Sequence, residues 1–516
     1  MKQSYRKFFI VMVLLVLINA LISLVMPVLV NYWSIQKVMI GTKEVIILLV
    51  VMFAGLGLKI GLSILREVFA LDFNKNNCRN YLEKYMDLNY GYISEKGPMN
   101  LLQRLGQSVS SIYLFLTGPA VFIYSNLVIV AAVLLISFFV NRIVFAILFL
   151  LIPFNYFAFK MLNAELFKRS KVLHEAKSKG WSNVYSVMTN TDYIKQSNNH
   201  KEILKKLEPN IDYIYSAIKN INIFAQASSA FISSISEIAQ IFVLLLVVKN
   251  SFESGNYLDT LTIGVLIPLY KSSLSEITDS NLGKQDYIVA QEFFQEWQEY
   301  YEATDGQSLE NIESIEFDLE ELGLGEKKIP FILKRTFNLG DIVWVKGESG
   351  SGKSTLLKLL PRFRDESTLY INGKDIREID LGNLRGKVEY MSQNVAMING
   401  SLRDNLFLDI PYNFQIEEAM IADPLLASIL KTKTLDSEIT ENGSNISGGE
   451  KQKIAMVRTL HKKPQVLILD EVCSSIDQES TNDIYRRLTQ EVEDKILFII
   501  DHHHPLDEFV NEIIAF

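Results

Sequence analysis

A glycine-rich segment at residues 347–355 carries the residue types that bind phosphate. It reads Gly-Glu-Ser-Gly-Ser-Gly-Lys-Ser-Thr, follows the apolar run Ile342–Val345 and precedes a helix-favouring run at 356–360. Glycines let backbone N–H groups curl around phosphate oxygens, where a side chain would block the approach. A helix that begins directly afterwards points its positive end at the same phosphates. The spacing therefore predicts a strand–loop–helix phosphate site, with a chance glycine-rich turn as the alternative.

The side chains of this segment indicate a nucleotide and a metal ion as its ligands. Lys353 is expected to reach the β- and γ-phosphates of ATP, and the Ser354 hydroxyl is expected to ligate Mg²⁺. The residues expected to bind ATP here are Gly347, Ser349, Gly350, Ser351, Gly352, Lys353, Ser354 and Thr355.

A second apolar run, Val466–Leu469, ends in the adjacent acids Asp470 and Glu471. Asp470 at the strand end is expected to hold Mg²⁺ through water. Glu471 is expected to orient and polarise the water that attacks the γ-phosphate. A plain solvated strand end is the alternative, but the phosphate motif in the same half of the chain favours the catalytic interpretation.

Three consecutive histidines, residues 502–504, follow a third apolar run, Ile496–Ile500, and Asp501. A metal-binding tract is one interpretation. Adjacent residues on an extended chain cannot all face one ion, because successive side chains point to opposite sides. A contact from one histidine to the γ-phosphate is therefore the favoured interpretation.

Residues 445–458 resemble the signature motif of ATP-binding-cassette proteins. The sequence there is Asn-Ile-Ser-Gly-Gly-Glu-Lys-Gln-Lys-Ile-Ala-Met-Val-Arg. The resemblance implies that Ser447, Gly448 and Gly449, at a helix start, offer N–H donors to the ATP held by a second subunit. It therefore implies a dimer, either a homodimer or a heterodimer, in which two ATP molecules hold two cassettes together.

Further segments resemble the same family. Gln393, in the segment Tyr390–Asn405, resembles the Q-loop glutamine, which implies a catalytic role and a role in Mg²⁺ ligation. Residues 474–477 (Ser-Ser-Ile-Asp) resemble the D-loop, which adds Asp477 to the nucleotide-binding residues. His502 aligns with the switch histidine, which makes it a catalytic residue. The Thr-Glu-Asn-Gly segment at 440–443 resembles a loop typical of exporters.

Two positions depart from the family pattern. The residue that stacks on adenine is usually aromatic, and in the segment Ile315–Leu319 our alignment places Leu319 there, with Phe317 a poor substitute. We therefore expect loose discrimination between ATP and GTP. Glu450 stands where the signature more often has glutamine.

The first part of the chain contains long apolar runs, each close to or above the roughly 20 residues that cross a bilayer as a helix. The clearest runs are Phe8–Val30, Val45–Leu65, Pro119–Val140, Ile143–Leu162 and Ile221–Val248. A sixth, Leu258–Leu282, is weaker because polar residues interrupt it. The first run is too long for a signal peptide, although a removed targeting segment is the alternative interpretation.

The two parts of the chain that differ in hydropathy also differ in net charge. Residues 1–310 carry a net charge of +3 and residues 311–516 a net charge of −11. We expect a transmembrane domain at 1–305 and a nucleotide-binding domain at 306–516. The absence of a dense basic tract argues against nucleic acid as a partner. Two cysteines, Cys78 and Cys473, are too few for a disulfide framework or a zinc site.

Basic residues indicate the orientation in the membrane. The polar segments 66–117 and 160–220 hold six and eleven Lys and Arg residues, whereas the intervening short loops hold few. The positive-inside rule then places both termini, these long segments and the ATPase domain in the cytoplasm. We expect about six transmembrane helices, with long cytoplasmic extensions, in the cytoplasmic membrane.

The combined expectation is an α-helical membrane domain followed by an α/β P-loop ATPase of the cassette type. The resemblance implies an exporter half-transporter that hydrolyses ATP to move a peptide, a lipid or an amphipathic small molecule by alternating access. The alternative is a membrane-embedded ATPase that senses or regulates and moves no cargo. The membrane domain excludes a soluble ATPase of the DNA-repair type.

Polar residues in the fifth and sixth runs recur at helical spacing. They are Gln226, Ser229, Ser233, Ser236, Glu237, Gln240, Ser272, Ser275, Glu276 and Asp279. An ionisable group in a bilayer normally faces a cavity or a partner. We expect a polar, acidic cargo path that suits a cationic group. Close helix packing through serines is the alternative, with Glu237 paired to Lys59 or Lys271.

Overall fold

The computed structural model describes residues 2–36, 41–254, 257–303, 305–324, 327–364, 369–440, 443–502 and 506–516. The chain divides into two compact units, Met1–Tyr301 and Glu302–Phe516. We call them the helical unit and the α/β unit, and each is described by itself.

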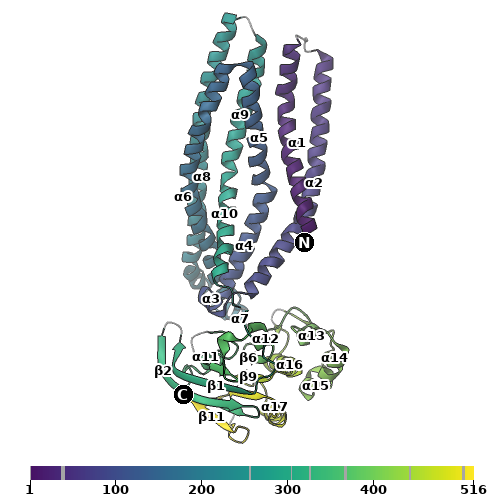
Figure 1. The fold of residues 1–516 in the computed structure, drawn as a ribbon, viewed down its shortest axis with the longest axis vertical. Helices are drawn as coiled ribbons and strands as arrows, with labels where there is room; N and C mark the ends of the chain where they lie inside the picture. Colours follow the sequence, from purple (N-terminus) through teal and green to yellow (C-terminus); the bar gives the residue numbers. More distant parts are fainter. Residues whose placement is uncertain are drawn as a thin grey trace. The chain divides into compact units, whose positions relative to one another are not determined.

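Long helices that lie side by side build the helical unit (Figure 1). Its helices are α1 (Lys2–Ile35), α2 (Thr42–Met86), α3 (Tyr90–Lys96), α4 (Pro98–Thr117), α5 (Pro119–Val140), α6 (Arg142–Met188), α7 (Thr191–Gln196), α8 (His200–Ser254), α9 (Tyr257–Asp279) and α10 (Asn281–Glu296). With its 55 residues, α8 extends about 80 Å, far more than the roughly 30 Å of a bilayer's hydrocarbon core. The predicted continuation of membrane helices into long polar extensions is therefore confirmed.

Five helical segments in the described part of the chain are long and apolar enough to cross a membrane. They are Arg6–Trp33, Thr42–Met86, Pro98–Val140, Arg142–Met188 and His200–Lys249. In Thr42–Met86, none of the most apolar stretch is buried inside the protein, as expected where lipid is the solvent. The weaker sixth run does form a helix, α9, which packs against α5 and α8 although it is not among the five.

Local sequence explains where several helices begin and end. Gly118 separates α4 from α5, and Pro119 occupies the first position of α5, where its missing N–H needs no partner. Asn141 caps α6 by accepting hydrogen bonds from the N–H groups of Ile143 and Val144.

Two sheets form the framework of the α/β unit. The antiparallel sheet has the order β2-β1-β4-β5, and its strands are β1 (Ser314–Leu324), β2 (Lys327–Asn338), β4 (Leu369–Ile371) and β5 (Lys374–Asp375). The parallel sheet has the order β11-β3-β10-β9-β6, and its strands are β3 (Ile342–Lys346), β6 (Val388–Met391), β9 (Val466–Asp470), β10 (Ile496–Ile500) and β11 (Glu512–Ala515). Strands β7 (Gly400–Ser401) and β8 (Glu438–Ile439) pair with each other in a separate two-stranded sheet.

The parallel sheet is buried on both faces, which explains why its strands are continuous apolar runs. Side chains alternate between two cores: Val343, Ile468 and Phe498 belong to one, whereas Trp344 and Leu469 belong to the other. The helices of this unit are α11 (Lys353–Leu357), α12 (Leu381–Arg385), α13 (Leu402–Leu406), α14 (Phe414–Ile421), α15 (Pro424–Leu430), α16 (Gly448–His461) and α17 (Gln478–Gln490).

Candidate functional site

The carboxyl ends of the parallel strands lie at one edge of the sheet, and the predicted catalytic segments follow them. Strand β10 pairs in parallel with both β3 and β9, and β6 pairs in parallel with β9. The phosphate loop follows β3, Asp470 ends β9, and His502 follows β10. Gln393 comes just after β6, with an exposed side chain. The fold thus places all four predicted segments at a common edge.

The loop between β3 and α11 has the backbone shape that a phosphate cradle needs. Gly350 and Gly352 have φ angles of +81° and +111°, which side-chain-bearing residues rarely adopt. Helix α11 begins at Lys353, immediately after Gly352. The strand–loop–helix arrangement predicted from the glycine spacing is therefore present.

Lys353 is held inside this loop. Its side chain is 5% exposed, and its Nζ donates hydrogen bonds to the carbonyl oxygens of Gly347, at 3.0 Å, and Glu348, at 2.6 Å. Burial lowers the pKa of Lys353, and the negative charges of Glu471 and Asp470 oppose that shift. The ammonium group is thus pre-positioned where a bound phosphate would take over from the loop carbonyls.

Oxygen donors suited to Mg²⁺ meet at the end of β9. The Ser354 hydroxyl donates a hydrogen bond to Asp470 Oδ1 at 3.0 Å, and the Tyr390 hydroxyl donates a short one to Asp470 Oδ2. Asp470 is 8% exposed. Mg²⁺ prefers hydroxyl and carboxylate oxygens beside phosphates, so this donor set fits the ion. Tyr390 lies within the predicted Q-loop segment, but its contact with Asp470, 80 residues away, could not be read from the sequence.

Glu471 and His502, the two residues predicted to be catalytic, lie close together. Glu471 has a φ of +52°, an unusual backbone conformation for a residue with a side chain, and its N–H donates to the carbonyl oxygen of Ile500 at 2.9 Å. Its Oε1 lies 3.5 Å from His502 Nε2. The neighbouring strands β9 and β10 therefore deliver an acid and an imidazole to one place.

A buried cluster behind these loops was not predicted. Tyr485 of α17 donates a hydrogen bond to Oδ2 of Asp501 at 2.5 Å, and both residues are less than 10% exposed. Burial raises the pKa of the Cys473 thiol to about 12, and burial also raises the pKa of Tyr485. Because Asp501 immediately precedes His502, this cluster fixes the backbone that carries the histidine.

The predicted signature segment begins a helix with a reciprocal cap. The Ser447 Oγ accepts a hydrogen bond from the N–H of Glu450 at 3.2 Å, and the Glu450 carboxylate accepts one from the N–H of Ser447 at 2.7 Å. This capping box explains the acid at position 450. The bond from the Ser447 N–H is the main reason why the pKa of Glu450 is lowered.

A depression of about 440 Å³ surrounds the start of α16 and includes Ser447, Gly448, Gly449 and Asp477. Gly449 has no space for a side chain, because a Cβ there would lie 2.7 Å from the carbonyl oxygen of Ser475. Asp477 caps α17, and its hydrogen bond from the N–H of Ser480 is the leading cause that lowers its pKa to about 2.

The expectation that Leu319 faces adenine is wrong. Leu319 is 2% exposed and Phe317 is fully buried, and both belong to the core of the α/β unit. A pair of aromatic side chains lies beside the phosphate loop instead. Phe331 of β2 stacks on Phe516 with ring centroids 4.2 Å apart, and the Cβ of Phe516 lies 2.7 Å from where a Gly347 Cβ would be.

The polar residues predicted in the membrane helices have mixed outcomes. Glu237 forms an ion pair with Lys271 at 2.6 Å, which confirms the alternative pairing. Asp279 accepts a hydrogen bond from Ser229 at 2.5 Å and lines a cavity together with Gln226 and Ser233.

Some predicted positions lie outside the described residues: Glu441 and Asn442 of the exporter-type loop, His503 and His504 of the histidine tract, and the side chain of Ser236. In the part of the chain that the structure describes, no group of three or more His, Cys, Asp or Glu side chains could hold a metal ion.

Comparisons with known sequences cover both units. Residues 9–273 match the family profile of the ABC transporter transmembrane region, and residues 332–474 match that of the ABC transporter. An ATP-dependent lipid A-core flippase from Photorhabdus laumondii is 37% identical over 34% of this chain and 31% of its own length. The SPbeta prophage-derived sublancin-168-processing and transport ATP-binding protein SunT of Bacillus subtilis is 29% identical over 68% of this chain and 51% of its own. The chain thus spans about a third of the first relative's length and about half of the second's.

A solved structure shares the fold over nearly the whole chain. It is the structure of a bacterial Atm1-family ABC exporter with ATP bound, with a TM-score of 0.84 and 18% sequence identity over 99% of this chain and 93% of the other. The transmembrane profile alone matches more than half of the residues. The chain therefore belongs to the ABC transporters, with its transmembrane region N-terminal to its nucleotide-binding domain.

Proposed function

We propose that this protein is an exporter subunit that hydrolyses ATP to move cargo out of the cytoplasm. The single observation that carries the proposal is the joint placement of the phosphate loop, Asp470, Glu471 and His502 at the edge of one parallel sheet. A helical unit with five segments able to cross a membrane precedes that site in the same chain.

ATP is bound in this proposal by the phosphate loop. Its backbone N–H groups hold the phosphates, and Lys353 exchanges its loop carbonyl partners for the β- and γ-phosphates. Ser354 and Asp470 would hold Mg²⁺, assisted by Gln393. The bound metal ion would neutralise the negative charge that develops on the phosphate groups.

Hydrolysis is assigned to the pair at the ends of β9 and β10. Glu471 accepts a hydrogen bond from the attacking water and orients it toward the γ-phosphate, and His502 contacts the γ-phosphate oxygen. Their 3.5 Å separation supports a shared site. Glu471 also has a positive φ, and strained backbone conformations of this kind cluster at active sites.

A second subunit completes each nucleotide site. The depression at the start of α16 exposes Ser447, Gly448 and Gly449, whose N–H groups meet the γ-phosphate held by the partner. Asp477 borders the same depression. Two half-transporters, identical or different, then close around two ATP molecules and open after hydrolysis, which alternates access to the membrane cavity.

Adenine is contacted by Phe331, because this partly buried aromatic side chain stacks on Phe516, which lies next to Gly347 of the phosphate loop. Base–aromatic stacking contributes about 1–3 kcal/mol per base, so Phe331→Ala should raise the Kd for ATP by roughly fivefold or more. The binding of inorganic triphosphate, which has no base, should not change. An unchanged Kd for ATP, measured by titration at low salt, would remove Phe331 from the site.

Cargo and orientation complete the proposal. Both termini, the helix extensions and the α/β unit lie in the cytoplasm, and the cargo is a peptide, a lipid or an amphipathic small molecule. Relatives named as an ATP-dependent lipid A-core flippase and as a sublancin-168-processing and transport protein support the proposal of export.

The decisive experiment uses the full chain in proteoliposomes with the ATPase domain facing out. Uptake of candidate cargo should require ATP and Mg²⁺ and should stop in Lys353→Ala. ATP hydrolysis that responds to cargo without any accumulation inside the vesicles would instead identify a membrane regulator.

A further inference from the structure

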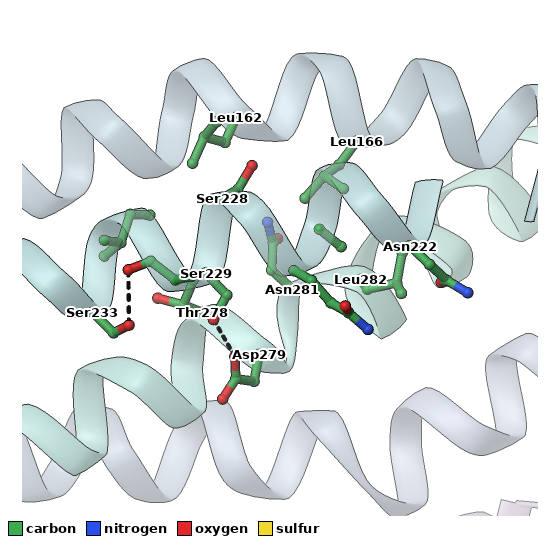
Figure 2. A pocket seen from close by; sticks show the side chains of 14 residues that line it. Leu162, Leu166, Asn222, Ser228, Ser229, Ser233, Thr278, Asp279, Asn281 and Leu282 are labelled. Atoms are coloured by element: carbon green, nitrogen blue, oxygen red, sulfur yellow. Dashed lines mark hydrogen bonds between the residues drawn. The ribbon is translucent and has the colours of Figure 1, made fainter. Parts of the chain in front are cut away.

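A cavity of about 410 Å³ lies in the helical unit between α6, α8, α9 and α10 (Figure 2). Its volume falls within the range of small-molecule sites. Leu162 and Leu166 come from α6, Asp279 from the end of α9 and Asn281 from the start of α10. Residues 222–233 of α8 supply the remaining wall.

The walls of this cavity are chemically divided. Apolar side chains contributed by three helices are Leu162, Leu166, Ile232 and Leu282. Uncharged polar side chains include Asn222, Gln226, Ser229, Ser233, Thr278 and Asn281. Asp279 is the one ionisable residue among the described lining residues. The cavity therefore offers an apolar surface, several hydrogen-bonding groups and a single negative charge.

Asp279 is oriented by a neighbouring helix. Its Oδ1 accepts a hydrogen bond from Ser229 of α8 at 2.5 Å, which Figure 2 shows as a dashed line. No described residue forms a hydrogen bond or an ion pair with Oδ2. The carboxylate is thus held in place while one oxygen remains for a ligand.

Three other acids on the adjacent helices have partners of their own. Glu237 pairs with Lys271 at 2.6 Å, and Glu276 accepts a hydrogen bond from Asn126 at 2.8 Å. Asp286, further along α10, bonds to Ser170 and lies 3.6 Å from His174. Among the described residues, no Lys, Arg or His forms an ion pair with Asp279, so its carboxylate has no basic partner.

We propose that this cavity binds the cationic group of an amphipathic cargo. An ammonium or guanidinium group pairs with Asp279 and Ser229, and the apolar part of the molecule packs against Leu162, Leu166 and Leu282. The carboxylate of Asp279 attracts a cationic group and repels an anionic head group. The inference rests on the proposed export function because it names the class of cargo.

The test uses three dansyl compounds that share a fluorophore and differ in charge. Dansylcadaverine carries a primary ammonium, N-butyl dansylamide is neutral, and dansylglycine is anionic. Binding to the full chain in phosphatidylcholine nanodiscs without nucleotide is followed by fluorescence. A charge-assisted hydrogen bond predicts roughly tenfold or greater preference for the cation over the neutral compound, with the anion weakest.

Substitutions show which residues cause the preference for the cationic compound. Asp279→Asn should remove it, Ser229→Ala should reduce it by roughly threefold, and Asp279→Glu, which keeps the charge, should retain most of it. Glu237→Gln is the matched control, because that acid is paired with Lys271 outside the cavity. Each variant is compared at equal nucleotide binding, which shows that it has folded.

Three outcomes would overturn the proposal. These are equal binding of cation and neutral compound by the parent protein, an unchanged preference in Asp279→Asn, and an equal loss in Glu237→Gln. Binding is measured without ATP, so it separates this inference from the export proposal. A preserved preference without ATP-driven uptake would overturn export alone, and uptake without the preference would overturn the cation site alone.

Discussion

Carboxylates are held differently in the two units. In the α/β unit, Asp470 and Asp501 are 8% and 6% exposed, and tyrosine hydroxyls donate to both. In the helical unit, the Glu237 side chain is 56% exposed and bonds to a residue on another helix. A buried acid with donors around it is preorganised, and removing a donor leaves an unsatisfied charge. An exposed acid with one partner is replaceable, because water can take over from that partner.

The largest effect that would test this contrast is expected at Glu471. Glu471→Gln should leave the Kd for ATP within roughly twofold and should lower the hydrolysis rate about 10²–10⁴-fold, because the base that orients water is lost while the phosphate loop is intact. Steady-state hydrolysis and nucleotide titration measure the two quantities. Lys353→Ala is the contrasting control, in which ATP binding itself should weaken. Turnover by Glu471→Gln at the parent rate would disprove the assigned role.

Removing a buried donor should have the next largest effect. Tyr485→Phe deletes the hydrogen bond to Asp501 beside His502. We expect a roughly three- to tenfold fall in kcat with little change in KM for ATP, since a displaced His502 affects the chemical step. Tyr412→Phe is the matched control, because it also deletes a tyrosine–carboxylate bond, to Glu417, elsewhere in the unit. Equal kinetic losses in both variants would indicate a general loss of stability.

The capping acid of α16 offers a smaller effect. Glu450→Gln keeps an oxygen acceptor for the Ser447 N–H but removes a negative charge from the helix start where the partner's phosphates bind. ATP-induced dimerisation should therefore strengthen roughly two- to threefold, since a charge at a helix terminus is worth about 0.3–1 kcal/mol. Light scattering of the Glu471→Gln background would measure it. Weaker dimerisation would show that the acid assists association.

No kinetic effect is expected at Glu237. Glu237→Gln should leave both basal and cargo-stimulated hydrolysis unchanged and should shift the Tm by no more than about 2 °C, because exposed ion pairs contribute little. A loss of stimulation would return Glu237 to the cargo path and would remove the contrast between paired and available acids.

Local patterns in the sequence were sufficient to predict which functional residues follow the strands. The phosphate loop, Asp470, Glu471 and His502 each follow an apolar run, and parallel pairing of those runs places them at one edge. The membrane helices could also be predicted, because their apolar length sets where they lie. The exact extent of α5, Pro119–Val140, coincides with the predicted run.

Long-range contacts could not be predicted in the same way. Leu319 was misplaced because the family alignment was followed instead of the strand's alternation, which turns Ile315, Phe317 and Leu319 into the same core. The contact between Tyr390 and Asp470 joins residues 80 positions apart. Whether Glu237 pairs with Lys59 or Lys271 depends on how two helices are rotated about their axes, and the sequence alone leaves both open.

Helix α17 connects the depression at the start of α16 to the backbone beside His502. Its first turn is capped by Asp477, at the depression offered to a second subunit, and Tyr485, two turns further on, holds Asp501 next to His502. In the proposed dimer, a partner subunit that shifted Asp477 would also shift Tyr485 on the same helix, and through it the backbone beside His502.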